Sequence, residues 1–294
     1  MHETGNPAGV RAWSRAARAG GRRVGFVPTM GFLHDGHLRL VDHARAHADA
    51  VAMSIFVNPL QFGPNEDYAR YPRDIPRDRA MAEERGVECL FVPEAGDIYR
   101  REAAVRVSPG SLAAHLCGPF RPRHFEGVLT IVAKLFHLVE PDVAVFGRKD
   151  AQQAAMVRRM VADLDFPVEI VVAPTVREAD GLALSSRNPY LSTDERRSAL
   201  ALSRGLDAGH EAFRRGAREG TAIVNAVAAV VQRDPAVNVE YIEAVDPDGL
   251  APVATASDTT LLAMAARIGK TRLIDNIILG QGLAGDERLG GTRG

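Results

Sequence analysis

Short apolar runs alternate with stretches of helical periodicity through the first 175 or so residues. The apolar, β-rich runs lie at residues 23–27, 50–57, 88–92, 142–146 and 168–173. Between them, residues 38–48, 76–85, 125–139 and 151–163 repeat apolar positions every three or four residues, which is typical of amphipathic helices. Strands that alternate with helices predict a parallel sheet with crossover helices, so we expect a Rossmann-like α/β domain over residues 1–175.

The pattern changes after residue 177. Residues 193–215 and 220–232 have helical periodicity, and residues 239–244, 259–265 and 271–276 have strand-like character. Helices followed by strands indicate a smaller α+β domain, which we expect over residues 176–294. The fold class predicted for the whole chain is therefore α/β, with this second domain at the carboxyl end.

Composition narrows the class of protein. The chain has 294 residues, of which 46% are hydrophobic and 25% charged, and its net charge is −1. These values are ordinary for a globular protein, and they give no bulk basic field to attract nucleic acid or a membrane surface. Two cysteines are too few for a disulfide framework, and the polar start of the chain lacks the apolar core of a signal peptide. We expect a cytoplasmic protein with neither nucleic-acid nor membrane partners.

The most informative segment follows the first predicted strand and reads Val-Pro-Thr-Met-Gly-Phe-Leu-His-Asp-Gly-His, residues 27–37. Gly31 and Gly36 allow the backbone to approach a ligand, and a helix start offers N–H groups and the positive end of a dipole. His34 and His37 are three residues apart, so they share a face if both lie on the first helical turn. The segment predicts a phosphate site. The alternatives are two surface histidines, or a metal site that lacks an obvious third ligand.

Three further segments carry polar side chains at predicted strand ends or helix starts. Asn58 and Gln61 follow the second strand and can bind hydroxyl and carboxylate groups, although turn chemistry alone also explains them. Lys149 follows the fourth strand and can reach a phosphate, unless it belongs to a solvated helix start.

In that same segment Asp150 can hold a ribose hydroxyl or cap the helix, and Gln153 lies one turn further on. In the last segment Ser185 and Ser186 precede Arg187, which makes an anion clamp or simply a polar interdomain loop.

The strings around these residues resemble one family. Pro-Thr-Met-Gly-x-Leu-His-x-Gly-His resembles the pantothenate synthetase (pantoate–β-alanine ligase) family of the nucleotidyltransferase superfamily. The strings Phe-Val-Asn-Pro-x-Gln-Phe, Phe-Gly-x-Lys-Asp-x-Gln-Gln and Arg-Glu-x-Asp-Gly-Leu-Ala-x-Ser-Ser-Arg-Asn resemble it too, in family order. The chain departs from the family at Glu126, Arg148, Ala151, Leu184 and Pro189.

The resemblance implies an ATP-dependent condensation of pantoate with β-alanine through pantoyl adenylate, with release of pyrophosphate and AMP. It implies that ATP contacts Met30, Gly31, Phe32, Leu33, His34, Asp35, Gly36, His37, Gly147, Arg148, Lys149, Asp150, Val176, Leu184, Ser185, Ser186 and Arg187. Of these, His34, His37, Lys149, Ser186 and Arg187 are the implied catalytic residues. Pantoate is expected to contact Asn58, Gln61 and Gln153.

Mg²⁺ is expected to bridge phosphate oxygens, with Asp78 as a candidate ligand, although a helix-start aspartate is the simpler interpretation of that residue. Family members are usually homodimers, so a homodimer is expected. Two alternatives stay open. Another nucleotidyltransferase would share the histidine segment without needing the amide side chains, and a non-enzymatic RNA-binding relative would need the basic clusters that this chain lacks.

Overall fold

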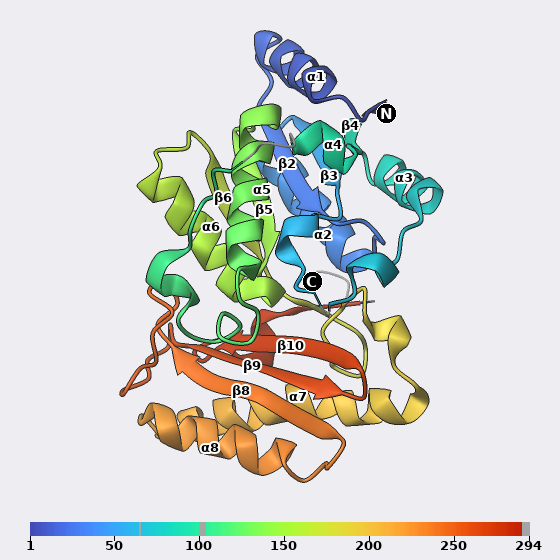
Figure 1. Ribbon diagram of the computed structural model, residues 1–294. Coiled ribbons are helices and arrows are strands. Elements are labelled where there is room, and N and C mark those ends of the chain that lie inside the picture. The colour runs from blue at the N-terminus through green and yellow to red at the C-terminus, as the bar shows by residue number, and fades with distance from the viewer. Residues whose placement is uncertain (65, 100–103, 290–294) are drawn as a thin grey trace. The chain divides into compact units, whose positions relative to one another are not determined.

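The computed structural model describes residues 1–64, 66–99 and 104–289, and this part of the chain forms two compact units (Figure 1). The first unit comprises Met1–Pro109, Arg121–Gly147 and Met156–Ala173. The second comprises Gly110–Phe120, Arg148–Ala155 and Pro174–Gly294. Two short stretches from within residues 1–175 therefore group with the second unit, and the division into residues 1–175 and 176–294 stays a prediction.

A parallel six-stranded sheet forms the centre of the first unit, in the order β1-β4-β3-β2-β5-β6. Its strands are β1 (His2–Thr4), β2 (Val24–Thr29), β3 (Ala50–Ile55), β4 (Cys89–Phe91), β5 (Val143–Gly147) and β6 (Glu169–Ala173). Residues of β2 and β3 are almost all buried, as expected for parallel strands covered on both faces. The predicted parallel α/β sheet is confirmed.

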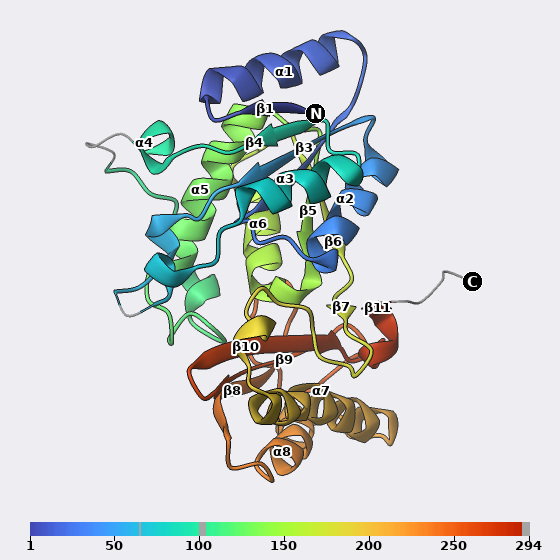
Figure 2. The ribbon, with the colours of Figure 1, turned by 90° about the vertical axis from the view of Figure 1, so that its right-hand side faces the viewer.

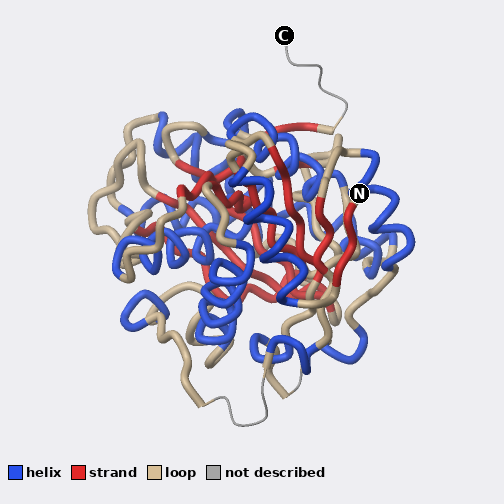
Figure 3. Tube along the Cα trace, turned by 90° about the horizontal axis from the view of Figure 1, so that it is seen from above, coloured by secondary structure: helices blue, strands red, loops and turns tan. Residues whose placement is uncertain are grey.

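Helices cover both faces of this sheet (Figures 2 and 3). They are α1 (Pro7–Ala19), α2 (Asp35–His47), α3 (Ile75–Glu84), α4 (Ala95–Ile98), α5 (His124–Val139) and α6 (Ala151–Asp163), whose first residues group with the second unit. Because the connections β2 to β3 and β3 to β4 step in one direction, right-handed crossovers place α2 and α3 on one face. The steps from β1 to β2 and from β4 to β5 run the other way, which places α1 and α5 on the opposite face.

The direction of the connections reverses between β2 and β5. In open α/β sheets, ligands bind at the carboxyl ends of the strands beside such a switch point. The predicted phosphate segment leaves the carboxyl end of β2, and the segment that contains Lys149 leaves that of β5. Chain topology therefore puts both candidate segments at strand ends that flank the switch.

The second unit is built on an antiparallel sheet in the order β10-β9-β8. Its elements are α7 (Thr193–Arg214), α8 (Gly220–Val231), β8 (Val237–Val245), β9 (Leu261–Ile268) and β10 (Thr271–Ile278), and a short ladder joins β7 (Val176–Arg177) to β11 (Glu287–Arg288). Both helices lie against one face of the sheet (Figure 1) and bury Leu206, Val227 and Met264 in a common core. The predicted α+β unit is confirmed, with its second strand beginning two residues later than expected.

None of the helices in the part of the chain that the structure describes has the length and apolar character needed to cross a membrane.

Candidate active site

The loop that follows β2 turns sharply at two residues with left-handed backbone. Gly31 has a φ of 81° and Phe32 a φ of 50°. A Cβ atom on residue 31 would lie 2.7 Å from Ile55 Cγ2 and 3.0 Å from Asp78 Oδ2. Glycine is therefore required at position 31 for two reasons, its backbone conformation and the closeness of its neighbours.

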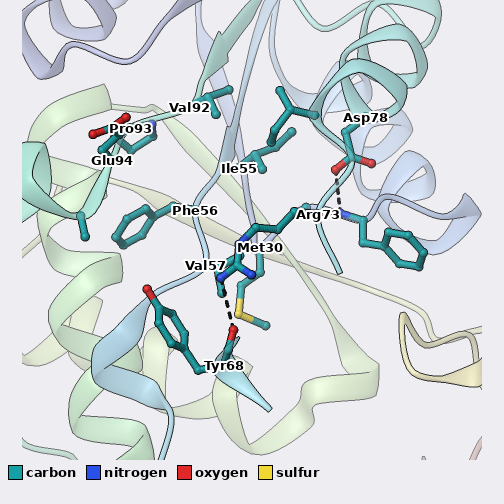
Figure 4. Close-up of a pocket in the computed structure, with 14 residues that line it drawn as sticks. Met30, Ile55, Phe56, Val57, Tyr68, Arg73, Asp78, Val92, Pro93 and Glu94 are labelled. Carbon is teal, nitrogen blue, oxygen red and sulfur yellow. Dashed lines mark hydrogen bonds between the residues drawn. The ribbon is translucent and has the colours of Figure 1, made fainter. Parts of the chain in front are cut away.

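The Asp78 side chain accepts hydrogen bonds from two backbone N–H groups of this loop. The side chain is fully buried, and its Oδ2 accepts a hydrogen bond from the Phe32 N–H at 2.6 Å (Figure 4). Its Oδ1 accepts a hydrogen bond from the Leu33 N–H at 2.7 Å. Burial raises the pKa of the Asp78 carboxyl above its usual value and outweighs these hydrogen bonds, which favour the charged form. Both oxygens face the backbone of the loop, so the interpretation of Asp78 as a magnesium ligand does not fit this geometry.

The two histidines meet at the start of α2, as their spacing predicts. His34 is the N-cap residue and its ring centroid lies 4.1 Å from that of His37. The His34 N–H donates to His37 Nδ1 at 3.4 Å, so a neutral His37 carries its proton on Nε2. A ring nitrogen that keeps its proton at a helix start can donate to an anionic oxygen, and the helix dipole adds to the attraction.

Gln61 and Asn58 lie together at the carboxyl end of β3, in the 3₁₀ turn η1 (Pro59–Gln61) and just before it. Asn58 Nδ2 donates to Gln61 Oε1 at 3.1 Å, and Gln61 Nε2 donates to Met30 Sδ at 3.1 Å. The Tyr99 hydroxyl donates to Asn58 Oδ1 at 2.7 Å, and burial raises the pKa of Tyr99 so that it remains a donor. Gln61, one of the predicted pantoate residues, thus contacts the loop that carries the histidines.

A pocket opens beside this loop at the carboxyl ends of β2, β3 and β4 (Figure 4). Its apolar wall includes Phe56, and Arg73 supplies a cation next to the ring of Tyr68, at 5.5 Å from the ring centroid. Met30 lines the pocket as well as contacting Gln61. Met30 therefore lies between the pocket and Gln61, one of the predicted binding residues of the first unit.

In the second unit, the turn that contains Lys149 is held by the carboxyl-terminal part of the chain. Asn276 Nδ2 donates to the carbonyl oxygens of Arg148 at 3.0 Å and of Lys149 at 2.9 Å. The Arg148 guanidinium donates to Asp286 Oδ1 at 2.6 Å and to Gln281 Oε1 at 2.6 Å. The Arg148 side chain thus faces residues of its own unit, and the Lys149 side chain keeps 22% of its surface exposed.

The two adjacent glutamines of α6 have different surroundings. Gln152 is buried, its Oε1 accepts from the Cys117 N–H at 2.9 Å, and its Nε2 donates to the carbonyls of Leu112 and His115 at 3.2 and 2.9 Å. Gln153 is half-buried. Because the carboxamide of Gln152 is fully engaged within its unit, Gln153 is the member of the pair suited to a ligand.

Hydrogen bonds within the loop and to the residues on either side of it fix the conformation of residues 185–187. Ser185 Oγ accepts from the Arg187 N–H at 3.2 Å, which closes a tight turn. Asn188 Nδ2 donates to Glu178 Oε1 at 2.8 Å, and Arg196 donates to the other oxygen of Glu178 at 2.7 Å. The Leu184 N–H donates to the Val176 carbonyl at 2.9 Å, which ties the loop to β7.

A buried arginine fixes the strand that precedes this loop. Arg177 is 1% exposed and donates to both oxygens of Asp275 at 2.8 Å and to Asp286 Oδ2 at 2.5 Å. Burial opposes its charge, but Asp275 and Asp286 hold the pKa of Arg177 above the usual arginine value. Asp286 thereby joins the strand before the serine loop to the turn that contains Lys149.

Comparisons with known proteins show which family the chain belongs to. Residues 4–278 match the family described as Pantoate-beta-alanine ligase. The chain belongs to the pantoate–β-alanine ligase family. It is 50% identical over 272 residues to the pantothenate synthetase of Pelotomaculum thermopropionicum, covering 92% of this chain and 96% of that protein. It is 54% identical over 265 residues to that of Acidobacterium capsulatum, covering 89% and 88%.

Solved structures of the family have the same fold. The pantothenate synthetase of Thermus thermophilus superposes with a TM-score of 0.90 at 46% identity, covering 95% of this chain and 99% of that one. The pantoate–β-alanine ligase of Francisella tularensis, solved with β-γ ATP and β-alanine, superposes with a TM-score of 0.78 at 31% identity, covering 96% and 99%.

Each unit of the chain contains its own share of the predicted residues. The first unit holds residues 30–37, Asn58, Gln61 and Gly147, and the second holds residues 148–150, Gln153, Val176 and residues 184–187. Sequence reasoning missed Tyr99 and the supporting role of Asp78. Among residues 1–64, 66–99 and 104–289, no group of three or more His, Cys, Asp or Glu side chains is arranged to hold a metal ion.

Proposed function

We propose that this pantoate–β-alanine ligase condenses pantoate with β-alanine through pantoyl adenylate. A pantoate carboxylate oxygen attacks the α-phosphorus of ATP, and pyrophosphate leaves with the electron pair of the broken P–O bond. The β-alanine nitrogen then attacks the acyl carbon, AMP leaves, and the nitrogen loses a proton. Neither step needs a covalent bond to the protein, so the residues act through position and charge.

His34 and His37 donate hydrogen bonds to phosphate oxygens at the start of α2, and Lys149, Ser186 and Arg187 neutralise the phosphate charge that redistributes in the transition state. Asp150 accepts from a ribose hydroxyl. The remaining ATP contacts follow the predicted segments: Met30, Gly31, Phe32, Leu33, Asp35, Gly36, Gly147, Arg148, Val176, Leu184 and Ser185.

Asn58, Gln61 and Gln153 orient pantoate by neutral hydrogen bonds to its hydroxyls and carboxylate. The observation that supports the proposal best is the contact between Gln61 Nε2 and Met30 Sδ at 3.1 Å. It brings the predicted pantoate residue against the loop that leads to His34 and His37, so a carboxylate held by Gln61 lies near a phosphate held by the histidines.

Mg²⁺ remains part of the proposal as a companion of the ATP phosphates, since Mg²⁺ is commonly held by substrate phosphates and water with few protein ligands. Asp78 does not fit as one of those ligands, and no step is assigned to the ion. A homodimer is also proposed, as the resemblance to the family implies, together with a cytoplasmic location, as the low cysteine content and the polar start of the chain indicate.

The test is a pyrophosphate-release assay with pantoate, and with acetate as the control carboxylate. We expect pyrophosphate release only with pantoate, and AMP formation only after β-alanine is added. Equal ATP turnover with acetate and pantoate would refute the substrate assignment.

A further inference from the structure

His124, the first residue of α5, and Arg121, three residues before it, contact the backbone carbonyl of Gln61. His124 Nδ1 lies 2.8 Å from the Gln61 carbonyl oxygen, and Arg121 Nη2 donates to the same oxygen at 3.4 Å. Arg121 Nη1 lies 3.0 Å from His124 Nε2. The three residues therefore form a closed triangle around one carbonyl group.

These contacts determine where the His124 proton lies. A guanidinium has only donors, so His124 Nε2 must accept from Arg121 and carries no proton. A carbonyl oxygen only accepts, so His124 Nδ1 must carry the proton and donate it to Gln61. Both neighbours thus select one neutral form of the ring, with hydrogen on Nδ1.

Glu66 fixes Arg121 in turn. Its two oxygens accept from Arg121 Nε at 2.8 Å and from Arg121 Nη2 at 2.6 Å, which is the paired geometry that defines a guanidinium plane. Both side chains are partly buried, with 24% and 16% of their surfaces exposed. The orientation of the donor to His124 is therefore set by two bonds and does not depend on a flexible side chain.

The same helix also touches the η1 turn directly. A Cβ atom on Gly127 would lie 2.3 Å from the Leu60 carbonyl oxygen and 2.7 Å from the Gln61 nitrogen. Asn58 Nδ2 donates to the Gly127 carbonyl at 3.0 Å. The first turn of α5 thus contacts η1 on both sides of Gln61, and little room remains for the turn to move.

We propose that Arg121 and His124 are positioning residues for pantoate: they fix the backbone of Gln61 so that its carboxamide is held in place before substrate arrives. The inference rests on the proposed role of Gln61 in binding pantoate. It gives a function to the string Arg-Pro-Arg-His-Phe-Glu-Gly-Val, residues 121–128, in which Glu126 stands where the family usually has arginine.

The test compares two substitutions of one residue. In His124→Asn the amide nitrogen can replace Nδ1–H, whereas in His124→Gln the amide reaches the position of Nε2 and leaves the Gln61 carbonyl with only the longer bond from Arg121. We expect His124→Gln to raise the pantoate KM about tenfold, the scale of one lost hydrogen bond, and His124→Asn to stay within about threefold of wild type. The ATP KM should be unchanged in both variants.

A coupling measurement shows whether His124 acts through Gln61. In a Gln61→Ala background, His124→Gln should add less than about a twofold effect on the pantoate KM, because the group that it positions is gone. Equal behaviour of the Asn and Gln variants, or full additivity with Gln61→Ala, would overturn the proposal.

Nitrogen NMR of the wild-type protein provides a readout independent of activity and of variant folding. We expect the His124 signals of a neutral ring protonated at Nδ1; a ring protonated at Nε2 would overturn the proposal. If the wild-type enzyme fails to turn over with pantoate while this NMR signature is present, the proposed function fails and the geometry of His124 stands.

Discussion

Replacing Asp78 by asparagine separates a loop anchor from a metal ligand. The change is nearly isosteric, but the two carboxylate oxygens of Asp78 face two N–H donors, those of Phe32 and Leu33. An asparagine offers one acceptor and one NH₂ group, so one backbone donor must face another donor. A buried donor without an acceptor costs about 1–3 kcal/mol. Removing the buried charge offsets part of this, because burial raises the pKa of Asp78 and thus disfavours its charged form.

The direct readout is amide hydrogen exchange at Phe32 and Leu33. A net loss of about 1.4 kcal/mol corresponds to a tenfold larger equilibrium constant for local opening, so we expect protection at these amides to fall by about tenfold or more. Activity should fall with it, since the loop places the histidines, and misplacement by about 1 Å lowers rates by about a hundredfold. Additional Mg²⁺ should restore neither quantity.

Asp74→Asn is the matched control. Asp74 caps α3 by accepting from the Arg77 N–H at 3.1 Å, and asparagine caps helices as well as aspartate does. This variant loses the same charge four residues away and should keep both protection and activity. If Asp78→Asn kept the protection of both amides and recovered its activity at high Mg²⁺, Asp78 would not anchor the loop. The result would then support Asp78 as a magnesium ligand.

Three other substitutions test separate parts of the structure. Gly127→Ala should raise the pantoate KM and lower the free energy of unfolding by about 1–3 kcal/mol, because the new methyl group overlaps the backbone at Leu60. The control Gly96→Ala, which has open space around the new methyl group, should leave thermal unfolding unchanged. Asp275→Asn breaks a buried ion pair with arginine and should lower the stability of the second unit by about 3 kcal/mol in urea unfolding, and a loss below about 1 kcal/mol would contradict this. Lys149→Ala should lower kcat for adenylation in single-turnover assays, with poor rescue by arginine, and a wild-type rate would remove Lys149 from the phosphate site.

Strong apolar runs made most of the fold predictable. The five strands expected in the first unit are all present, and α6 spans the predicted residues 151–163. The pattern failed for β1 and α1, which precede residue 20. In α1 the buried positions are Val10 and Ser14, and Arg15 fastens the helix by pairing with Glu140 at 2.7 Å. The helix is amphipathic, but its polarity contrast comes mainly from arginines and small residues, with few large apolar side chains to mark it in the sequence.

In the candidate site, residues that lie close together in the sequence could be predicted, whereas contacts between residues far apart in the sequence could not. The histidine pair, the Asn58 and Gln61 pair and the serine loop could be proposed because each lies within one short string. The residues that support them could not be predicted, because they are far away in the sequence. Asp78 accepts from the Leu33 N–H across 45 residues, and His124 contacts the Gln61 carbonyl across 63 residues. Nothing in residues 58–61 indicates which later residue will donate to a particular carbonyl oxygen.

The family strings contain more polar residues than are proposed to contact a ligand, because some of these residues support the backbone instead. Beside Gln153 stands Gln152, whose carboxamide is bonded to three backbone groups of its own unit. Beside Ser185 stands Asn188, which bridges Glu178 and the Ala183 carbonyl. The carboxamides of Gln152 and Asn188 are thus committed to the scaffold, whereas neighbouring residues of the same strings are the ones proposed to contact the substrates. Substitution of Gln152 or Asn188 should therefore lower stability as well as substrate affinity, whereas substitution of Gln153 should raise the pantoate KM with little loss of stability.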